Sequence, residues 1–142
     1  MGDHGRQSAG AFLSTQKKSK IVKIKSFEDA CKTLQISSDI PTFPTETGAA
    51  AFYQLEIIAR ALNGNWKPDW NDSDQYKYYP WFGFRGGRFV FYVVICRCTS
   101  PTLGSRLCYK DEKTAEYAAE TFIDLYEKML HPTAADDFSD LL

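Results

Sequence analysis

The stretch that decides the fold is YKYYPWFGFRGGRFVFYVVICRC, residues 76–98. Gly86 and Gly87 divide it into two runs, 76–84 and 88–98, that are rich in aromatic and β-branched residues. A Gly-Gly pair between two such runs favours a tight turn between antiparallel strands. Pro80 marks the first strand as an edge or bulged strand, because proline has no N–H for the ladder. The second run is almost entirely apolar, and we predict that it is the central strand of a sheet.

Further elements are predicted on both sides of this hairpin. Apolar residues recur at helical spacing in three segments, which predicts helices at about 27–34, 46–63 and 112–130. Two more strands are predicted at 20–25 and 105–110. The residues predicted to cap and stop these helices are Ser26, Thr45 or Thr47, Gly64 and Asp111.

The predicted order of elements is therefore β-α-α-β-β-β-α. Sequential strands joined by short loops favour an antiparallel meander, and helices segregated from strands favour the α+β class. We predict an α+β fold in which helices pack a small antiparallel sheet of three to four strands. The length of 142 residues fits one domain.

Composition suggests where this domain begins and ends. Residues 1–19 are rich in Gly, Ser, Gln and Lys without periodicity, which is typical of a disordered basic arm. Residues 133–142 are predicted to be an acidic mobile tail, so the single domain spans 20–132. No segment has the apolar length of a membrane span, and residues 1–10 lack the apolar core of a secretion signal. We expect a cytoplasmic protein that makes no membrane contact.

The sequence offers little support for a metal site. Zinc could use the four cysteines, but the spacing of Cys96 and Cys98 on a strand is not that of a zinc knuckle. We predict buried, metal-free thiols at Cys31, Cys96, Cys98 and Cys108. The acidic loop 69–74 lacks the glycine of a calcium loop at its sixth position, where Asp74 stands, and is predicted to be a turn.

Catalytic motifs are also missing from the sequence. It contains no nucleophile elbow, zinc-protease or phosphate-loop pattern. His4 falls in the polar arm and His131 at a helix end, so neither is placed as a general base. Glu116 and Glu120 are most simply the solvated side of a helix, although a glycosidase-like carboxylate pair stays open. We predict no catalytic residue, no metal and no cofactor.

Aromatic residues give the clearest functional signal. Of the 21 aromatic residues, eleven fall within 66–92, with lysine and arginine interleaved among them. Rings with cationic neighbours on a sheet are typical of single-stranded nucleic-acid binding, in which rings stack on bases. Because side chains alternate between the two faces of a strand, half of such rings can instead point into the core. The other half then stay on the surface, where they can contact a protein. Under either hypothesis the candidate binding residues are Trp66, Trp70, Tyr78, Trp81, Arg85 and Arg88.

The end of the sequence gives a second signal. Residues 134–142 place Phe138, Leu141 and Leu142 among three aspartates. Short acidic-hydrophobic peptides of this kind can fold onto a groove of a partner. The segment is similar to the tails that single-stranded-DNA-binding proteins offer to partners, but it lacks their Pro-Phe ending. These three apolar residues are therefore also candidate binding residues.

Several strings suggest a biological context. KPDW at 67–70, YKYYPWF at 76–82, GSRLCYK at 104–110 and AEYAAETFIDLY at 115–126 resemble a group of uncharacterised proteins from bacteriophages and mobile elements of gut bacteria. The resemblance spans about 46–130 and implies a bacterial host cell, but no site residues. The leading hypothesis is a non-enzymatic protein-binding module with an unknown protein partner. Single-stranded nucleic-acid binding is the alternative, and an enzyme is third.

Overall fold

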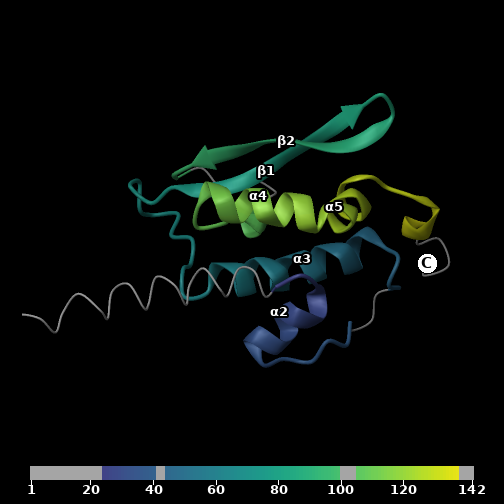
Figure 1. Ribbon diagram of the computed structural model, residues 1–142, viewed down its shortest axis with the longest axis horizontal. Helices are drawn as coiled ribbons and strands as arrows, with labels where there is room; N and C mark the ends of the chain where they lie inside the picture. Colours follow the sequence, from purple (N-terminus) through teal and green to yellow (C-terminus); the bar gives the residue numbers. More distant parts are fainter. Residues whose placement is uncertain (1–23, 41–43, 100–104, 138–142) are drawn as a thin grey trace, which may run out of the picture.

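The computed structural model describes residues 24–40, 44–99 and 105–137. Across these ranges the α+β class is confirmed, with four α-helices and a two-stranded antiparallel sheet. The elements in chain order are α2 (Phe27–Leu34), α3 (Gly48–Asn63), β1 (Lys77–Arg85), β2 (Arg88–Arg97), η1 (Ser105–Leu107), α4 (Glu112–Thr121), α5 (Ile123–Leu130) and η2 (Ala134–Asp136). They form layers, with the hairpin on α4 and α5, these helices on α3, and α2 beneath (Figure 1).

The predicted hairpin is confirmed. Arg85 pairs with Arg88 across the turn, and Gly86 and Gly87 have φ angles of 58° and 77°. A turn with two positive φ angles matches the twist of antiparallel strands, and glycine adopts it without a steric cost. The register shifts between Trp81 and Phe82, so that Tyr92 is an extra residue in β2 and forms a bulge.

The predicted strand at 105–110 is wrong. Residues 105–107 form η1, and only Tyr109 meets the sheet, through an isolated bridge to Tyr78. On the side away from β1, the Asn63 amide of α3 donates to the Cys108 carbonyl at 3.0 Å and accepts from the Lys110 N–H at 3.0 Å. Pairing with β1 stops at Tyr109 because residues 105–107 curl into η1, and because Pro80 on the facing edge of β1 has no N–H to donate. Among the described residues the sheet has two strands, so β2 is not a central strand.

The predicted strand at 20–25 lies mostly outside the described residues, since these begin at Ile24. Neither Ile24 nor Lys25 is in a strand. The Ile24 side chain is buried, and its carbonyl accepts a hydrogen bond of 2.8 Å from the Tyr117 hydroxyl of α4. This contact ties the start of the described chain to the helical core.

Three predicted caps are confirmed, and one predicted helix is divided. The side chains of Ser26, Thr47 and Asp111 accept N–H groups from the first turns of α2, α3 and α4. The predicted helix at 112–130 breaks at Phe122, where φ is −115° and ψ is 27°. The break separates α4 from α5 and leaves both Phe122 and Tyr126 buried in the core.

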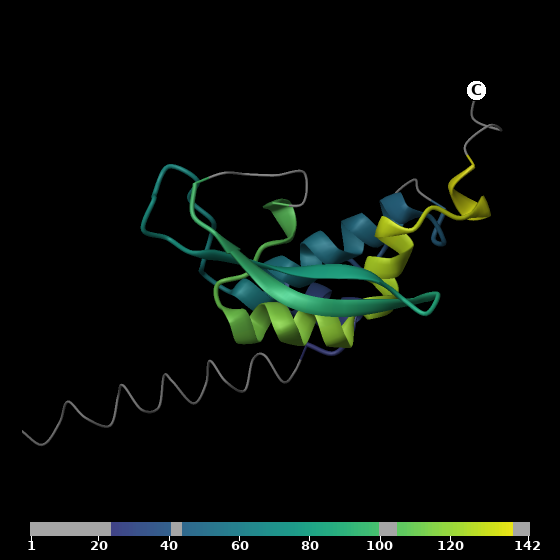
Figure 2. The ribbon, with the colours of Figure 1, turned by 90° about the horizontal axis from the view of Figure 1, so that it is seen from above.

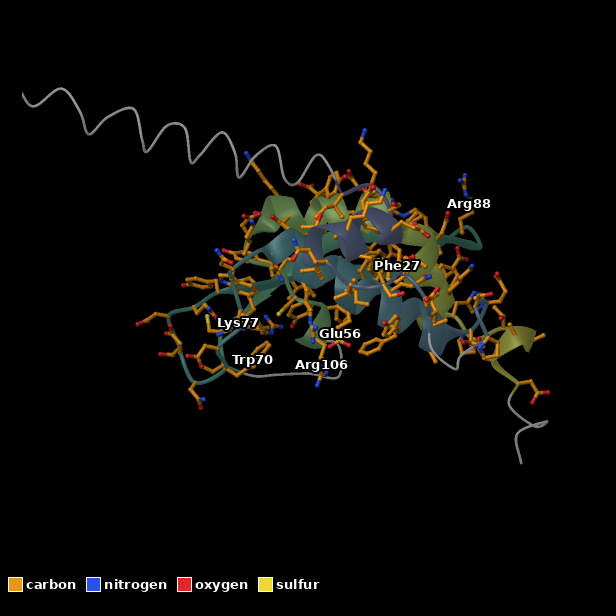
Figure 3. The ribbon with its side chains drawn as sticks, turned by 90° about the horizontal axis from the view of Figure 1, so that it is seen from below. Phe27, Glu56, Trp70, Lys77, Arg88 and Arg106 are labelled. Atoms are coloured by element: carbon orange, nitrogen blue, oxygen red, sulfur yellow. The ribbon has the colours of Figure 1, made fainter. Side chains whose placement is uncertain are left out.

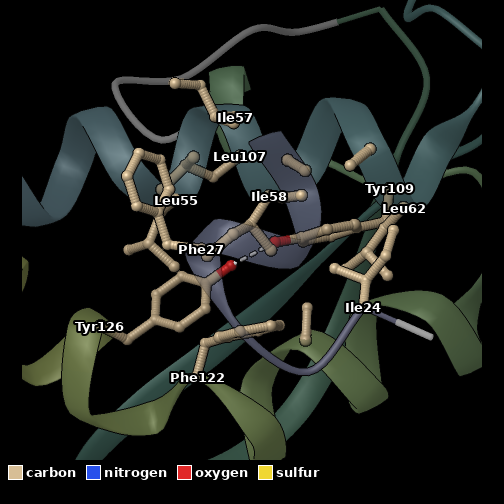
Figure 4. Packing of buried hydrophobic residues seen from close by; sticks show 14 of the residues in the cluster. Ile24, Phe27, Leu55, Ile57, Ile58, Leu62, Leu107, Tyr109, Phe122 and Tyr126 are labelled. Carbon is tan, nitrogen blue, oxygen red and sulfur yellow. Dashed lines mark hydrogen bonds between the residues drawn. The ribbon is translucent and has the colours of Figure 1, made fainter. Parts of the chain in front are cut away.

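The core lies between the helices and the inner face of the hairpin (Figure 4). Its largest fully buried side chains include Tyr109 and Tyr126, whose hydroxyl oxygens are 2.7 Å apart. The Tyr126 ring also lies 4.6 Å from the Phe82 ring, centroid to centroid. Burial raises the pKa of both tyrosines, so each phenol keeps its proton at neutral pH.

The two predicted mobile ends are described only in part. The arm at 1–19 and residues 138–142 lie outside the described ranges. Thr133 caps η2 through a reciprocal pair of bonds with Asp136. The Asp136 carboxylate also accepts the Gly48 N–H at 2.6 Å, and these bonds lower its pKa. The first part of the predicted tail therefore contacts the start of α3.

Candidate binding surface

The hairpin presents two chemically different faces. Side chains on the inner face pack against the core, and they include Tyr78, Phe82, Phe89 and Val94. On the outer face Trp81 is 53% exposed, Val93 52% and Tyr92 43%. Figure 2 looks down on this face, and within the described ranges no helix or strand lies over it. Trp81 is therefore accessible to a partner, whereas the Tyr78 ring belongs to the inner face.

Tyr92 is fixed in place on the outer face. Its ring lies so close to Gly83 that a Cβ at that position would be 2.3 Å from it. Its hydroxyl donates to the Phe84 carbonyl at 3.0 Å, and the Arg85 guanidinium lies 5.4 Å from the ring centroid. Gly83 is thus required for this arrangement, and its role was not predicted from the sequence. The only available signal was a lone glycine within a strand pattern.

Charge on the hairpin has one sign. Residues 77–97 contain Lys77, Arg85, Arg88 and Arg97 but no aspartate or glutamate. The three arginines are exposed, whereas Lys77 is completely buried. Arginine is enriched at protein interfaces, and its exposed guanidinium groups attract acidic partners. The accessible hairpin surface is therefore both apolar and cationic.

The Lys77 side chain lies inside the protein, where it has a structural role. Its Nζ donates to the carbonyls of Asp69, Asp72 (3.1 Å) and Cys98 (2.6 Å) and lies 5.1 Å from the centroid of the Trp70 ring. The buried ammonium thus joins the loop before β1 to the residue that follows β2. Figure 3 shows Trp70 and Lys77 together, at the opposite end of the molecule from Arg88. Trp70 is placed where it shields this ammonium.

Trp66 lies in a separate hollow of about 600 Å³ between the second half of α3 and the loop that follows it. Arg60, Lys67 and Arg106 also line this hollow, and Arg106 pairs with Glu56 at 2.6 Å. The predicted binding residues are therefore not brought together on one surface. Trp81, Arg85 and Arg88 share the hairpin, Trp66 and Trp70 do not, and Phe138, Leu141 and Leu142 lie outside the described residues.

A groove beside β1 was not predicted from the sequence. It has a volume of about 280 Å³ and is open to the surface. The residues that line it come from β1, α5 and the end of η1, namely Tyr79, Pro80, Trp81, Phe82, Leu107, Tyr126, Met129 and Leu130. The walls are mostly apolar, and the size suits one or two side chains. Its formation depends on packing between distant elements, which no local pattern reveals.

The four cysteines differ in burial. Cys31 and Cys108 are buried, and Cys96 and Cys98 are half-buried. The described part of the chain brings no three or more His, Cys, Asp or Glu side chains together as a possible metal site. Burial raises the pKa of the Cys108 thiol to about 11, which keeps it protonated and unreactive at neutral pH. The described residues also contain no helix that is long and apolar enough to span a membrane.

Comparison with known proteins gives no relative. No protein-family model, curated protein or solved structure matches the chain. The resemblance to bacteriophage and mobile-element proteins stays a prediction.

Proposed function

We propose that this protein is a non-enzymatic binding module that contacts a protein partner through the outer face of its hairpin. The observation that carries the proposal is the exposure of large apolar side chains. Of the seven that the described residues expose, four belong to the hairpin: Trp81, Tyr92 and Val93 lie on its outer face, and Phe84 lies on the inner side next to the turn. Contiguous apolar exposure of this kind is typical of an interaction site. We place its action in the cytoplasm of a bacterial host, as a phage or mobile-element product.

The composition of the outer face favours a protein over a nucleic acid. Trp81 pairs with Val93, and Gly83 pairs with Val90, so aliphatic side chains accompany the exposed rings. Aliphatic groups bury well against protein but offer no face on which a base can stack. The Tyr92 ring is also already in contact with Gly83 and Arg85. Aromatic residues and arginine beside aliphatic ones are the usual composition of a protein interface.

A photo-crosslinking amino acid in place of Trp81 tests this proposal in the cells that express the gene. We expect one dominant protein adduct, because the side chain lies within the proposed contact surface. The control is the same amino acid in place of Ile36, which is 44% exposed and follows α2, far from the hairpin in the fold. If positions 81 and 36 gave the same adducts in the same yield, a specific contact at the hairpin would be contradicted.

Single-stranded nucleic acid is a second candidate, favoured by the absence of acidic residues from 77–97. If bases stack on Trp81, oligonucleotides should quench tryptophan fluorescence, and binding should weaken steeply with salt. We expect no quenching at moderate salt, because the chain has a net charge of −1. Submicromolar binding that Arg85→Ala and Arg88→Ala each weaken would instead make nucleic acid the leading function.

A further inference from the structure

One edge of β1 is left without a partner strand in the described residues. Tyr78 exchanges two backbone hydrogen bonds with Tyr109, of 3.0 Å and 2.6 Å, on the side away from β2. Backbone groups alternate in direction along a strand, so those of Pro80 and Phe82 point to this same side. Pro80 presents only a carbonyl, whereas Phe82 presents both an N–H and a carbonyl. The Phe84 carbonyl already accepts a hydrogen bond from the Tyr92 hydroxyl, so the open edge ends at Phe84.

The third strand predicted at 105–110 would have paired with this open edge. A strand continuing back from Tyr109 would run beside Pro80 and Phe82, but η1 turns the chain away after a single bridge. The groove of about 280 Å³ lies along the vacated edge. Leu107 at the end of η1 forms one wall of the groove, and Met129 and Leu130 of α5 form another part. Backbone donors and acceptors therefore stand next to a hollow of side-chain size.

We propose that this edge of β1 binds an extended, acidic polypeptide segment by strand addition, with one apolar side chain of the segment in the groove. The inference goes beyond the proposed outer-face contact, because it adds a second contact surface along the edge of β1 and names the kind of partner and how it binds. An extended polypeptide is the ligand whose N–H and C=O groups repeat at the spacing of the edge. Pairing would place its backbone opposite the Pro80 carbonyl and both backbone groups of Phe82.

Charge at the end of the edge selects an acidic segment. The Arg85 side chain lies over Tyr92, whose hydroxyl marks the end of the open edge at Phe84. The His131 ring lies 5.1 Å from the Phe84 ring. A carboxylate at this end of the bound segment would meet Arg85, and the hairpin has no acidic side chain to repel it. The groove itself accepts an apolar residue.

The probe is a displayed library of random short peptides, selected on the whole protein. Matched baits are Leu130→Asp, in the groove, and Val93→Asp, on the outer face, because both side chains are 52% exposed in the native chain. We expect acidic peptides with alternating apolar residues to be enriched on the native protein and on Val93→Asp, but not on Leu130→Asp. Circular dichroism confirms that each bait is folded.

The enriched peptides are then synthesised with N-methyl groups on alternate amides. Methylation of the amides that face β1 should weaken binding about tenfold or more, because it removes backbone hydrogen bonds, while methylation of the other amides should not. Equal effects of the two methylation patterns, or no enrichment beyond the Leu130→Asp bait, would overturn strand addition. Loss of enrichment on Val93→Asp alone would also overturn it, yet would support the proposed outer-face contact, which crosslinking at position 81 tests separately.

Discussion

Replacing Lys77 with methionine is expected to lower the free energy of unfolding by about 2–4 kcal/mol. The native ammonium is fully buried and donates to three carbonyls, those of Asp69, Asp72 and Cys98. Methionine has a similar length but no donor, so these three carbonyls would lose their charged partner. Urea unfolding followed by circular dichroism measures the change.

The control for this experiment is Lys67→Met in the same loop. Lys67 is exposed, so its replacement should change the free energy of unfolding by less than about 0.5 kcal/mol. Lys77→Arg should restore little stability, because a planar guanidinium cannot take the place of a compact ammonium among three carbonyls. If Lys77→Met unfolds at the same urea concentration as the native protein, the ammonium is solvated and the loop is held by other contacts.

Local signals explain why the hairpin and the helix starts could be predicted. Gly86 and Gly87 supply positive φ angles on their own, whatever the rest of the chain does. Ser26, Thr47 and Asp111 accept from N–H groups three residues ahead, within the same turn. The strand at 105–110 failed for the opposite reason. Its extended backbone ends at η1, and the Asn63 amide of α3 holds Cys108 and Lys110 through contacts that depend on tertiary packing.

The candidate surface was predictable only in part. Alternation correctly implies that some rings of 76–92 turn inward and others outward. Which ring faces which way depends on how the helices cover the sheet, as Phe84 illustrates. It shares the inner side with Phe82 and Phe89 yet is 50% exposed. Lys77 was equally hidden from sequence reasoning, because a lysine beside a loop rich in aspartate looks like an ordinary solvated residue.

The second large effect is expected from Tyr126→Ala, which should lower the free energy of unfolding by about 3–5 kcal/mol. Tyr126 is 2% exposed, and its ring lies between the helical core and Phe82 of the hairpin. Its removal leaves a cavity at the junction of the two layers. The substitution also removes the hydrogen-bond partner of the buried Tyr109 hydroxyl, which lies 2.7 Å from the Tyr126 hydroxyl. A buried hydroxyl without a partner lowers the free energy of unfolding further. Chemical unfolding of the purified variant measures the loss.

Trp81→Ala is the matched test, because it deletes a larger ring that also lines the groove shared with Tyr126. Trp81 is 53% exposed, so its removal creates no enclosed cavity, and the free energy of unfolding should fall by less than about 1 kcal/mol. The two variants thus separate a ring that holds the hairpin to the helices from a ring that is free for a partner. A loss at Trp81 as large as that at Tyr126 would mean that the outer face is packed in solution. The outer face would then be core, and the proposed contact surface would have to lie elsewhere.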